Sequence, residues 1–130
     1  MRRKHNLEAK IRDYIAKNGG GVTEVKTSTG RIDIVFYERQ IIVEVKKISN
    51  WKQAIGQLVC YRDGTSNVRG FTPHLLLFGK PSLKPYLFEE LNKPTYLELQ
   101  KQCGNLGINF EFFPKDTLIE LAFTRNILLF

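Results

Sequence analysis

Residues 30–46, GRIDIVFYERQIIVEVK, constrain the fold of this chain more than any other stretch. Two runs rich in Ile, Val and Phe, residues 31–37 and 40–46, flank a short polar turn at Glu38-Arg39. β-Branched and aromatic runs of this length on either side of a short turn are typical of an antiparallel β-hairpin. We therefore expect two paired strands here, each with charged side chains set among apolar ones.

The hairpin register predicts where those charges lie. A turn centred on Glu38-Arg39 pairs residues whose numbers add up to 77, which sets Asp33 opposite Glu44. Side chains alternate along a strand, so Glu44 and Lys46 share the face of Asp33. The Cβ atoms of a directly opposed pair lie about 4.5–5.5 Å apart. The opposite face of the first strand is expected to carry Ile32, Ile34 and Phe36.

Two carboxylates at that distance repel each other, and burial raises the cost of both. One of them can stay protonated, a protein cation can intervene, or a divalent metal ion can bind between them. Lys46 neutralises one charge only, so we favour a hard cation with oxygen ligands, with Mg²⁺ as the first choice. The alternative is a solvated strand face on which Asp33, Glu44 and Lys46 have no joint function.

Charge is distributed unevenly along the 130 residues. The net charge is +7, and residues 1–85 carry 16 Lys and Arg against 7 Asp and Glu. Clustered basic residues favour a polyanionic partner such as nucleic acid, because phosphate binding releases counterions. The alternative is a basic surface that only aids solubility. A chain of this length is expected to form one domain, residues 1–130.

Hydrophobic periodicity predicts the remaining elements. LEAKIRDYIAKNGGG indicates a first helix capped by Asn6, and VTEVKT an edge strand. SNWKQAIGQLVCYRDG indicates a second helix whose residues Asn50 and Gln53 form a capping-box pattern. TPHLLLFG and INFEFF indicate two further strands, with a helix over residues 94–103 between them. This order predicts an α/β fold with a central mixed sheet flanked by helices. The type of the apolar C-terminal stretch is ambiguous.

Cysteine content and hydropathy indicate the cellular compartment in which the protein is expected. Cys60 and Cys103 are far apart and form no C-x-x-C pair, so neither a disulfide framework nor a zinc site is indicated. No apolar run reaches about 18 residues, the length expected of a membrane span. The sequence predicts a soluble, intracellular protein of a reducing compartment, cytoplasmic or nuclear in type.

The charged residues of the hairpin also form a recognisable pattern. Gly30-x-x-Asp33 followed by Glu44-x-Lys46 resembles the signature of the PD-(D/E)xK nuclease superfamily. The proline of that name is absent, because Ile32 precedes Asp33. The resemblance implies a restriction-endonuclease-like αβββαβ core over about residues 5–80, with residues 81–130 as an extension.

Two further features extend the resemblance. Gln57-x-x-x-Tyr61 is similar to the Q-x-x-x-Y motif of the RecB-like exonuclease branch, and Glu8 occupies the place of the superfamily's helix-borne glutamate. The spacing of Glu8, Asp33, Glu44 and Lys46 within a short chain is similar to that of archaeal Holliday-junction resolvases, which typically lack the Q-x-x-x-Y pair.

The resemblance implies a metal-dependent deoxyribonuclease, an endonuclease selective for a site or for a branched structure such as a junction, as in recombination and repair. Asp33, Glu44 and the Val45 carbonyl would bind Mg²⁺, with Mn²⁺ able to substitute, and Lys46 would hold or deprotonate the attacking water. Glu8 could reach a second metal ion or a metal-bound water. Alternatives are a silent or partner-dependent nucleic-acid-binding module of this fold and an RNA-processing nuclease. Double-stranded or branched DNA and a second copy of the chain, in a homodimer, are the expected partners.

Nucleic-acid contacts are expected from two sets of residues. Gln53, Gln57 and Tyr61 lie four residues apart and so share one stripe of the second helix. The basic candidates for phosphate contact are Arg2, Arg3, Lys4, Lys10, Arg31, Lys47 and Lys52.

Overall fold

The computed structural model describes residues 3–79 and 93–113, with side chains from residue 7 onward. It confirms an α/β fold whose first six main elements follow the predicted order αβββαβ. The helices are α1 (Arg3–Gly19), α2 (Trp51–Gly64) and α3 (Tyr96–Leu106). The strands are β1 (Val22–Thr27), β2 (Gly30–Phe36), β3 (Ile41–Lys47), β4 (Thr72–Phe78) and β5 (Asn109–Phe113). Short 3₁₀ turns cover Ile48–Asn50 and Ser66–Val68.

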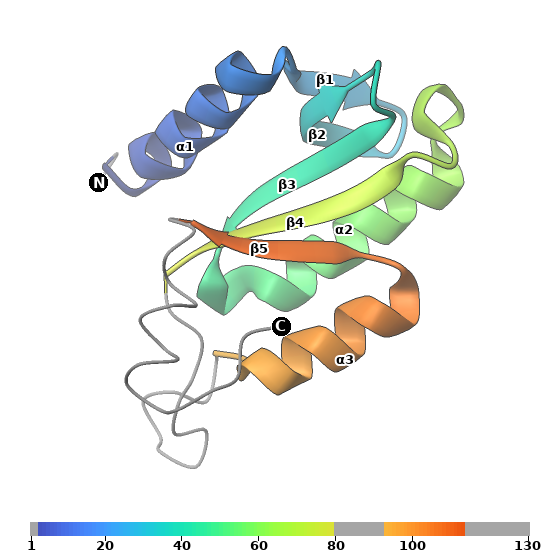
Figure 1. Ribbon diagram of the computed structural model, residues 1–130. Helices are drawn as coiled ribbons and strands as arrows, with labels where there is room; N and C mark the ends of the chain where they lie inside the picture. The colour runs from blue at the N-terminus through green and yellow to red at the C-terminus, as the bar shows by residue number, and fades with distance from the viewer. Residues whose placement is uncertain (1–2, 80–92, 114–130) are drawn as a thin grey trace.

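The five strands form one mixed sheet in chain order, β1-β2-β3-β4-β5 (Figure 1). Strand β2 runs antiparallel to both β1 and β3, whereas β4 runs parallel to β3 and β5 parallel to β4. Helix α2 connects β3 to β4, as a parallel pair requires. The described sheet therefore has β3 at its centre and β1 at an edge, where VTEVKT was expected.

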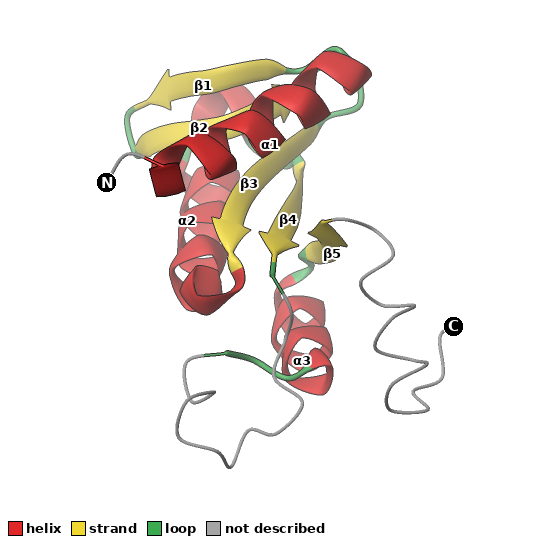
Figure 2. Cartoon of the chain, turned by 90° about the vertical axis from the view of Figure 1, so that its left-hand side faces the viewer, coloured by secondary structure: helices red, strands yellow, loops and turns green. Residues whose placement is uncertain are grey.

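Helices cover both faces of this sheet, with α1 on one side and α2 and α3 on the other (Figures 1 and 2). The larger core lies under α2 and α3 and includes Trp51, Leu58 and Leu99. A smaller core lies under α1 and includes Ile11 and Val45. Because the central strands are covered on both faces, they contain near-continuous apolar runs.

The predicted hairpin register is confirmed where β2 pairs with β3. The rungs are Ile34↔Val43, Val35↔Ile42 and Phe36↔Ile41, and each pair of numbers adds up to 77. Gln40 closes the turn with a φ of 57°, and its amide donates to the Tyr37 carbonyl at 3.2 Å. The register therefore sets Asp33 level with Glu44, immediately beyond the last rung.

The predicted face of Ile32 is wrong. Ile34 and Phe36 pack in the core under α1, whereas Ile32 packs with Val35 in the core under α2. Strict alternation would keep Ile32 with Ile34. The alternation slips at Asp33, where the strand backbone departs from regular pairing.

One predicted helix start is also wrong, whereas the predicted start of α2 after Asn50 is confirmed. Helix α1 begins at Arg3, so Asn6 lies inside the helix rather than at its cap. Asn50 precedes α2 without any side-chain capping bond. Here the 3₁₀ turn leads directly into the helix, so the chain enters α2 already turning, and the capping-box pattern is not used.

Helix α3 lies slightly further along the chain than predicted. Thr95 caps it, because its side chain accepts from the Glu98 amide and its own amide donates to the Glu98 side chain, both at 3.0 Å. Gly107, with a φ of 71°, ends the helix in the left-handed conformation. The reciprocal cap at Thr95 and the left-handed Gly107, rather than Pro94 and Gly104, set the two ends of α3.

The C-terminal stretch of ambiguous type and most of the predicted extension lie outside the described residues. Within the described ranges, no helix is both long and apolar enough to cross a lipid bilayer.

Candidate metal and nucleic-acid site

The two opposed carboxylates interlock through the backbone of their neighbours. The Asp33 amide donates to Glu44 Oε1 at 3.2 Å, and the Val45 amide donates to Asp33 Oδ2 at 2.8 Å. Each strand thus binds the carboxylate that the other strand presents. The predicted convergence of Asp33 and Glu44 on one point of the sheet is confirmed.

Glu44 lies deep in the protein, with 1% of its surface exposed. Burial, followed by the negative charge of Asp33 and a hydrogen bond shared with its carboxyl group, raises the pKa of Glu44 to about 9. Without a cation, the pair therefore holds a proton near neutral pH. This is the first of the three ways in which opposed carboxylates become tolerable.

Lys46 and Glu8 extend this cluster toward α1. Lys46 Nζ lies 4.0 Å from Glu8 Oε2, and the two side chains are 20% and 35% exposed. The helix therefore brings Glu8 to the strand that carries Glu44, as expected of a helix-borne glutamate. Its described partner is Lys46, and no group of three or more His, Cys, Asp or Glu side chains within residues 3–79 and 93–113 could hold a metal ion. A direct metal bond from Glu8 stays a prediction.

The chemistry of the donors fits a small, hard cation. Asp33 and Glu44 offer carboxylate oxygens, the ligands that Mg²⁺ prefers. A cation between them would replace the proton on Glu44 and offset the burial and the charge of Asp33 that raise its pKa. The Val45 amide already holds Asp33 in place, while the role of the Val45 carbonyl stays a prediction.

The three polar residues of the α2 stripe differ in exposure. Gln53 is exposed, and Gln57 is partly buried. Gln57 Oε1 is buried and has no hydrogen-bond partner, so it is a polar atom for which the described fold supplies no donor. Tyr61 is only 2% exposed. The stripe therefore leads from the surface into the core beneath the strands.

Tyr61 supports β2 and does not reach the surface. Its hydroxyl donates to the Arg31 carbonyl at 2.8 Å, and burial, then the charges of Glu44 and Asp33, raises its pKa to about 12. A Cβ added at Gly30 would lie 3.2 Å from the Tyr61 hydroxyl oxygen, so β2 approaches the ring closely. The expectation that Tyr61 contacts nucleic acid is wrong, because its side chain is enclosed by protein.

The basic candidates differ in how far the structure describes them. Lys10, Arg31, Lys47 and Lys52 are exposed. Lys52 Nζ lies 5.7 Å from the centre of the Trp51 ring. Arg2 lies outside the described residues, and Arg3 and Lys4 belong to the part of α1 whose side chains are not described.

A polar cavity of about 320 Å³ lies at the start of α2. It is lined by Lys52 and Gln53, which the sequence singled out, and by Lys93, which it did not. Lys93 is 40 residues beyond Gln53 and only the fold brings it here. A basic residue next to the cap of α3 was the one available signal, and by itself it carries little weight.

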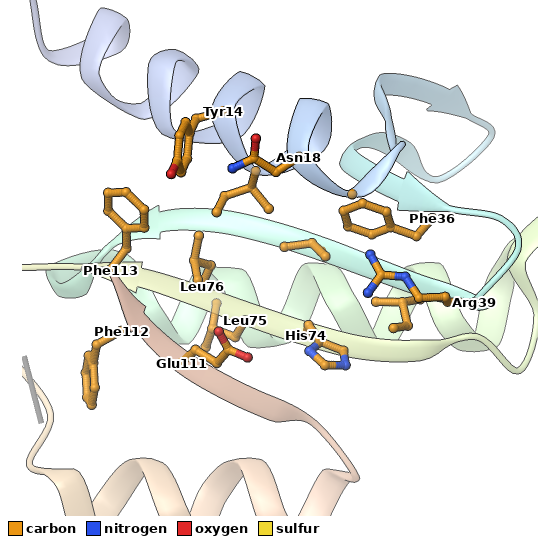
Figure 3. Close-up of a pocket in the computed structure, with 14 residues that line it drawn as sticks. Tyr14, Asn18, Phe36, Arg39, His74, Leu75, Leu76, Glu111, Phe112 and Phe113 are labelled. Atoms are coloured by element: carbon orange, nitrogen blue, oxygen red, sulfur yellow. The ribbon is translucent and has the colours of Figure 1, made fainter. Parts of the chain in front are cut away.

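A larger cavity of about 490 Å³ lies between α1 and the strands β4 and β5 (Figure 3). Its lining is mainly apolar, with Leu76 and Phe113 on the sheet and Tyr14 above them. Arg39, stacked 4.3 Å from the centre of the Phe36 ring, lies at one end. None of the predicted site residues lines this cavity, so it is separate from the carboxylate pair.

Comparison with known proteins gives short matches only. The chain is 43% identical over 54 residues to "Putative KilA-N domain-containing protein L33" of Acanthamoeba polyphaga mimivirus, which is 42% of this chain and 21% of that protein. It is 40% identical over 57 residues to "Putative KilA-N domain-containing protein R878" of the same virus, which is 44% of this chain and 15% of that protein. The chain thus spans about a fifth or less of these relatives. No family model and no solved structure matches it.

Proposed function

We propose that this chain is a Mg²⁺-dependent deoxyribonuclease that hydrolyses DNA phosphodiester bonds, acting as an endonuclease on a specific site or a branched structure. The observation that carries the proposal is the interlocked pair of the partly exposed Asp33 and the buried Glu44, on the strand that also carries Lys46. A fold that only needed stability would not place a second carboxylate against the buried Glu44, because burial of charge opposes folding. The matched relatives are named for a KilA-N domain and not for a nuclease, so the proposal rests on the site.

Each residue has a defined task in this reaction. Asp33 and Glu44 would hold the cation, which when bound acts as a Lewis acid on a phosphate oxygen and lowers the pKa of a bound water. Lys46 would orient the attacking water and offset the negative charge that develops on the phosphate. Glu8, whose Oε2 lies 4.0 Å from Lys46 Nζ, would hold that ammonium group in position between α1 and β3.

The DNA backbone would approach from the start of α2. Lys47, the last residue of β3, and Lys52, in the first turn of α2, are exposed, and Lys52, Gln53 and Lys93 line the polar cavity there. Phosphate contacts at this end of β3 would bring the scissile bond to Lys46. These contacts position the strand without reading its sequence.

The test is cleavage of labelled single-strand, duplex, flap and four-way-junction DNA with Mg²⁺ or Mn²⁺. Asp33→Asn, Glu44→Ala and Lys46→Ala should each lower the cleavage rate by about 10²–10³-fold, the usual effect of losing one preorganised electrostatic group. Lys101→Ala serves as the matched control, since this lysine is exposed on α3 and has no assigned contact with DNA or with the carboxylate pair. Equal cleavage by Asp33→Asn and the unmodified chain would refute the assignment.

A second candidate is a nucleic-acid-binding module without catalysis. The absence of a third metal-binding side chain near the pair, within the residues that the structure describes, favours it. DNA binding that persists in Asp33→Asn, with no cleavage by any variant in either metal, would establish this alternative. Matched RNA substrates in the same assay would separate an RNA-processing enzyme from a deoxyribonuclease, and sedimentation with and without junction DNA would test the proposed homodimer.

A further inference from the structure

Strand β1 contains a backbone conformation that its sequence does not predict. Glu24 has a φ of 52°, in the left-handed region, although it lies in the middle of the strand. Among the described residues other than glycine, Gln40 is the other such case, and it lies in a turn where positive φ is common. A non-glycine residue held in this region inside a strand is strained and persists only when its surroundings fix it.

The residue opposite Glu24 is Asp33. The β1–β2 ladder includes Thr23↔Ile34 and Val25↔Ile32, but the rung between them is missing. The register is the same on both sides of the gap, so no residue has been inserted. The pairing opens at one point only, and that point is the strand position that carries the first carboxylate.

This opening explains the orientation of the Asp33 side chain. In a regular strand the side chain stands perpendicular to the sheet. Here Asp33 Oδ2 accepts from the Val45 amide at 2.8 Å, so the carboxylate extends sideways toward the backbone of β3. The slip that sends Ile32 and Ile34 into opposite cores occurs across the same residue.

Arg12 of α1 holds Glu24 in this conformation. Arg12 Nη1 lies 2.7 Å from Glu24 Oε2, and the Arg12 side chain is 18% exposed. Arg12 Nε is fixed in turn by Asp13 Oδ1 at 3.0 Å. Glu8, one helical turn before Arg12, pairs with Lys46, so α1 contacts both the kinked edge strand and the site strand.

We propose that Arg12 and Glu24 are positioning residues for the metal site, because their ion pair keeps the β1–β2 rung open and so directs Asp33 toward Glu44 and Val45. The inference rests on the proposed function for its consequence in catalysis. Its structural part, the orientation of the Asp33 carboxylate, is independent of the proposed function. Neither residue touches the reacting atoms.

The experiment uses the full chain and compares three variants. Arg12→Ala removes the partner of Glu24. Glu24→Gly removes the ion pair but adopts positive φ without strain. The double variant Arg12→Ala/Glu24→Gly tests for rescue, and Lys17→Ala, on the same helix and exposed, is the control. The readouts are hydrogen exchange of the Val45 amide by NMR, Mg²⁺ affinity by calorimetry, and kcat and KM for DNA cleavage.

Arg12→Ala should accelerate Val45 amide exchange and weaken Mg²⁺ binding by about tenfold, as the loss of outer-shell support does in metal sites. It should lower kcat by about 10–100-fold with KM unchanged, since a small misplacement of a reacting group costs this much. Glu24→Gly and the double variant should stay within about threefold of the unmodified chain, because glycine populates positive φ freely.

Two results would overturn the inference. One is Val45 exchange and Mg²⁺ affinity in Arg12→Ala equal to those of Lys17→Ala. The other is a double variant as impaired as Arg12→Ala, which would mean that Arg12 acts through docking of α1 rather than through Glu24. If no protein cleaves DNA, the proposed function fails, while Val45 exchange still decides the positioning role.

Discussion

Strand β3 has two neighbours, and its two edges are built differently. Toward β4 it pairs through seven consecutive rungs, from Ile41↔Thr72 to Lys47↔Phe78. Toward β2 it pairs through three rungs, which stop where Asp33 and Glu44 meet. The first edge is a regular parallel ladder, whereas the second changes from backbone pairing to bonds between side chains and backbone.

The difference teaches how a site is accommodated in a sheet. On the β4 side, Leu75 and Leu77 are 1% and 0% exposed, and close packing alone accounts for the regular ladder. On the β2 side, Glu44 is as deeply buried but carries an ionisable group whose pKa burial raises. One edge therefore contributes stability, while the other gives up stability to hold two carboxylates together.

The largest effect on folding should come from the β4 edge. Leu77→Ala should lower the free energy of unfolding by about 2–5 kcal/mol, because it leaves a cavity in the core under α2. Urea denaturation would measure the loss. Cleavage per folded molecule should stay within about threefold, since the β2 edge is intact. If fully folded Leu77→Ala lost most of its cleavage activity, the β4 edge would contribute to the site as well as to stability.

A change of the opposite sign is expected at Glu44. In the metal-free chain, Glu44→Gln should raise the free energy of unfolding by on the order of 1 kcal/mol near pH 8, because a buried ionisable group is replaced by a neutral one. Glu38→Gln, in the exposed turn, is the control.

The pH dependence of that change follows from the raised pKa of Glu44. The folded state keeps the proton up to about pH 9, whereas the unfolded chain loses it near pH 4.5. The contribution of Glu44 to stability is therefore fully present below pH 4.5 and is lost as the pH rises toward 9. The difference in unfolding free energy between Glu44→Gln and the unmodified chain should grow over this range. Thermal unfolding in EDTA across the range would measure it. An advantage that shrinks with rising pH would contradict the raised pKa.

A smaller effect is expected where α2 supports β2. Tyr61→Phe keeps the ring against Gly30 and removes the hydrogen bond to the Arg31 carbonyl, at a cost of about 1 kcal/mol in stability. DNA affinity should not change, because Tyr61 is 2% exposed. Thermal unfolding and fluorescence anisotropy with labelled DNA would measure both quantities. Weaker DNA binding at unchanged stability would restore Tyr61 as a contact residue.

The smallest effect concerns His74 of β4. Burial, opposed by Glu111 and reinforced by Arg39, lowers the pKa of His74 below 6.5. Its contribution to stability is therefore present above pH 6.5 and lost as the pH falls below that value. His74→Gln should flatten this part of the stability curve, which unfolding midpoints between pH 5 and 7 would show. If the pH dependence of the unfolding midpoint is unchanged in His74→Gln, groups other than His74 cause the loss of stability at acid pH.

Much of this structure could be predicted from local sequence patterns. The hairpin register follows from the position of the turn, and it correctly set Asp33 level with Glu44. Parallel pairing of β3 with β4 follows from the helical stretch between them. The ends of α3 could have been found as well, because Thr95 and Glu98 have capping-box spacing.

Other features depend on contacts that no local pattern records. The positive φ of Glu24 occurs without Gly or Asn and depends on an arginine twelve residues earlier. The burial of Tyr61 depends on how closely α2 approaches Gly30. Helical spacing placed Tyr61 on one stripe with Gln53, but spacing alone does not tell at which depth the stripe enters the core.

The agreement between strand order in space and strand order along the chain has a consequence for folding. Each strand pairs with the one made just before it, so β1, β2 and β3 can join by short loop closures, and β4 and β5 can add in turn as the chain emerges during synthesis. Asp33 and Glu44 therefore meet in the hairpin while they are still hydrated. Their desolvation comes only when α2 packs beneath them, so the energetic penalty of the site falls late in folding, after its geometry has been set.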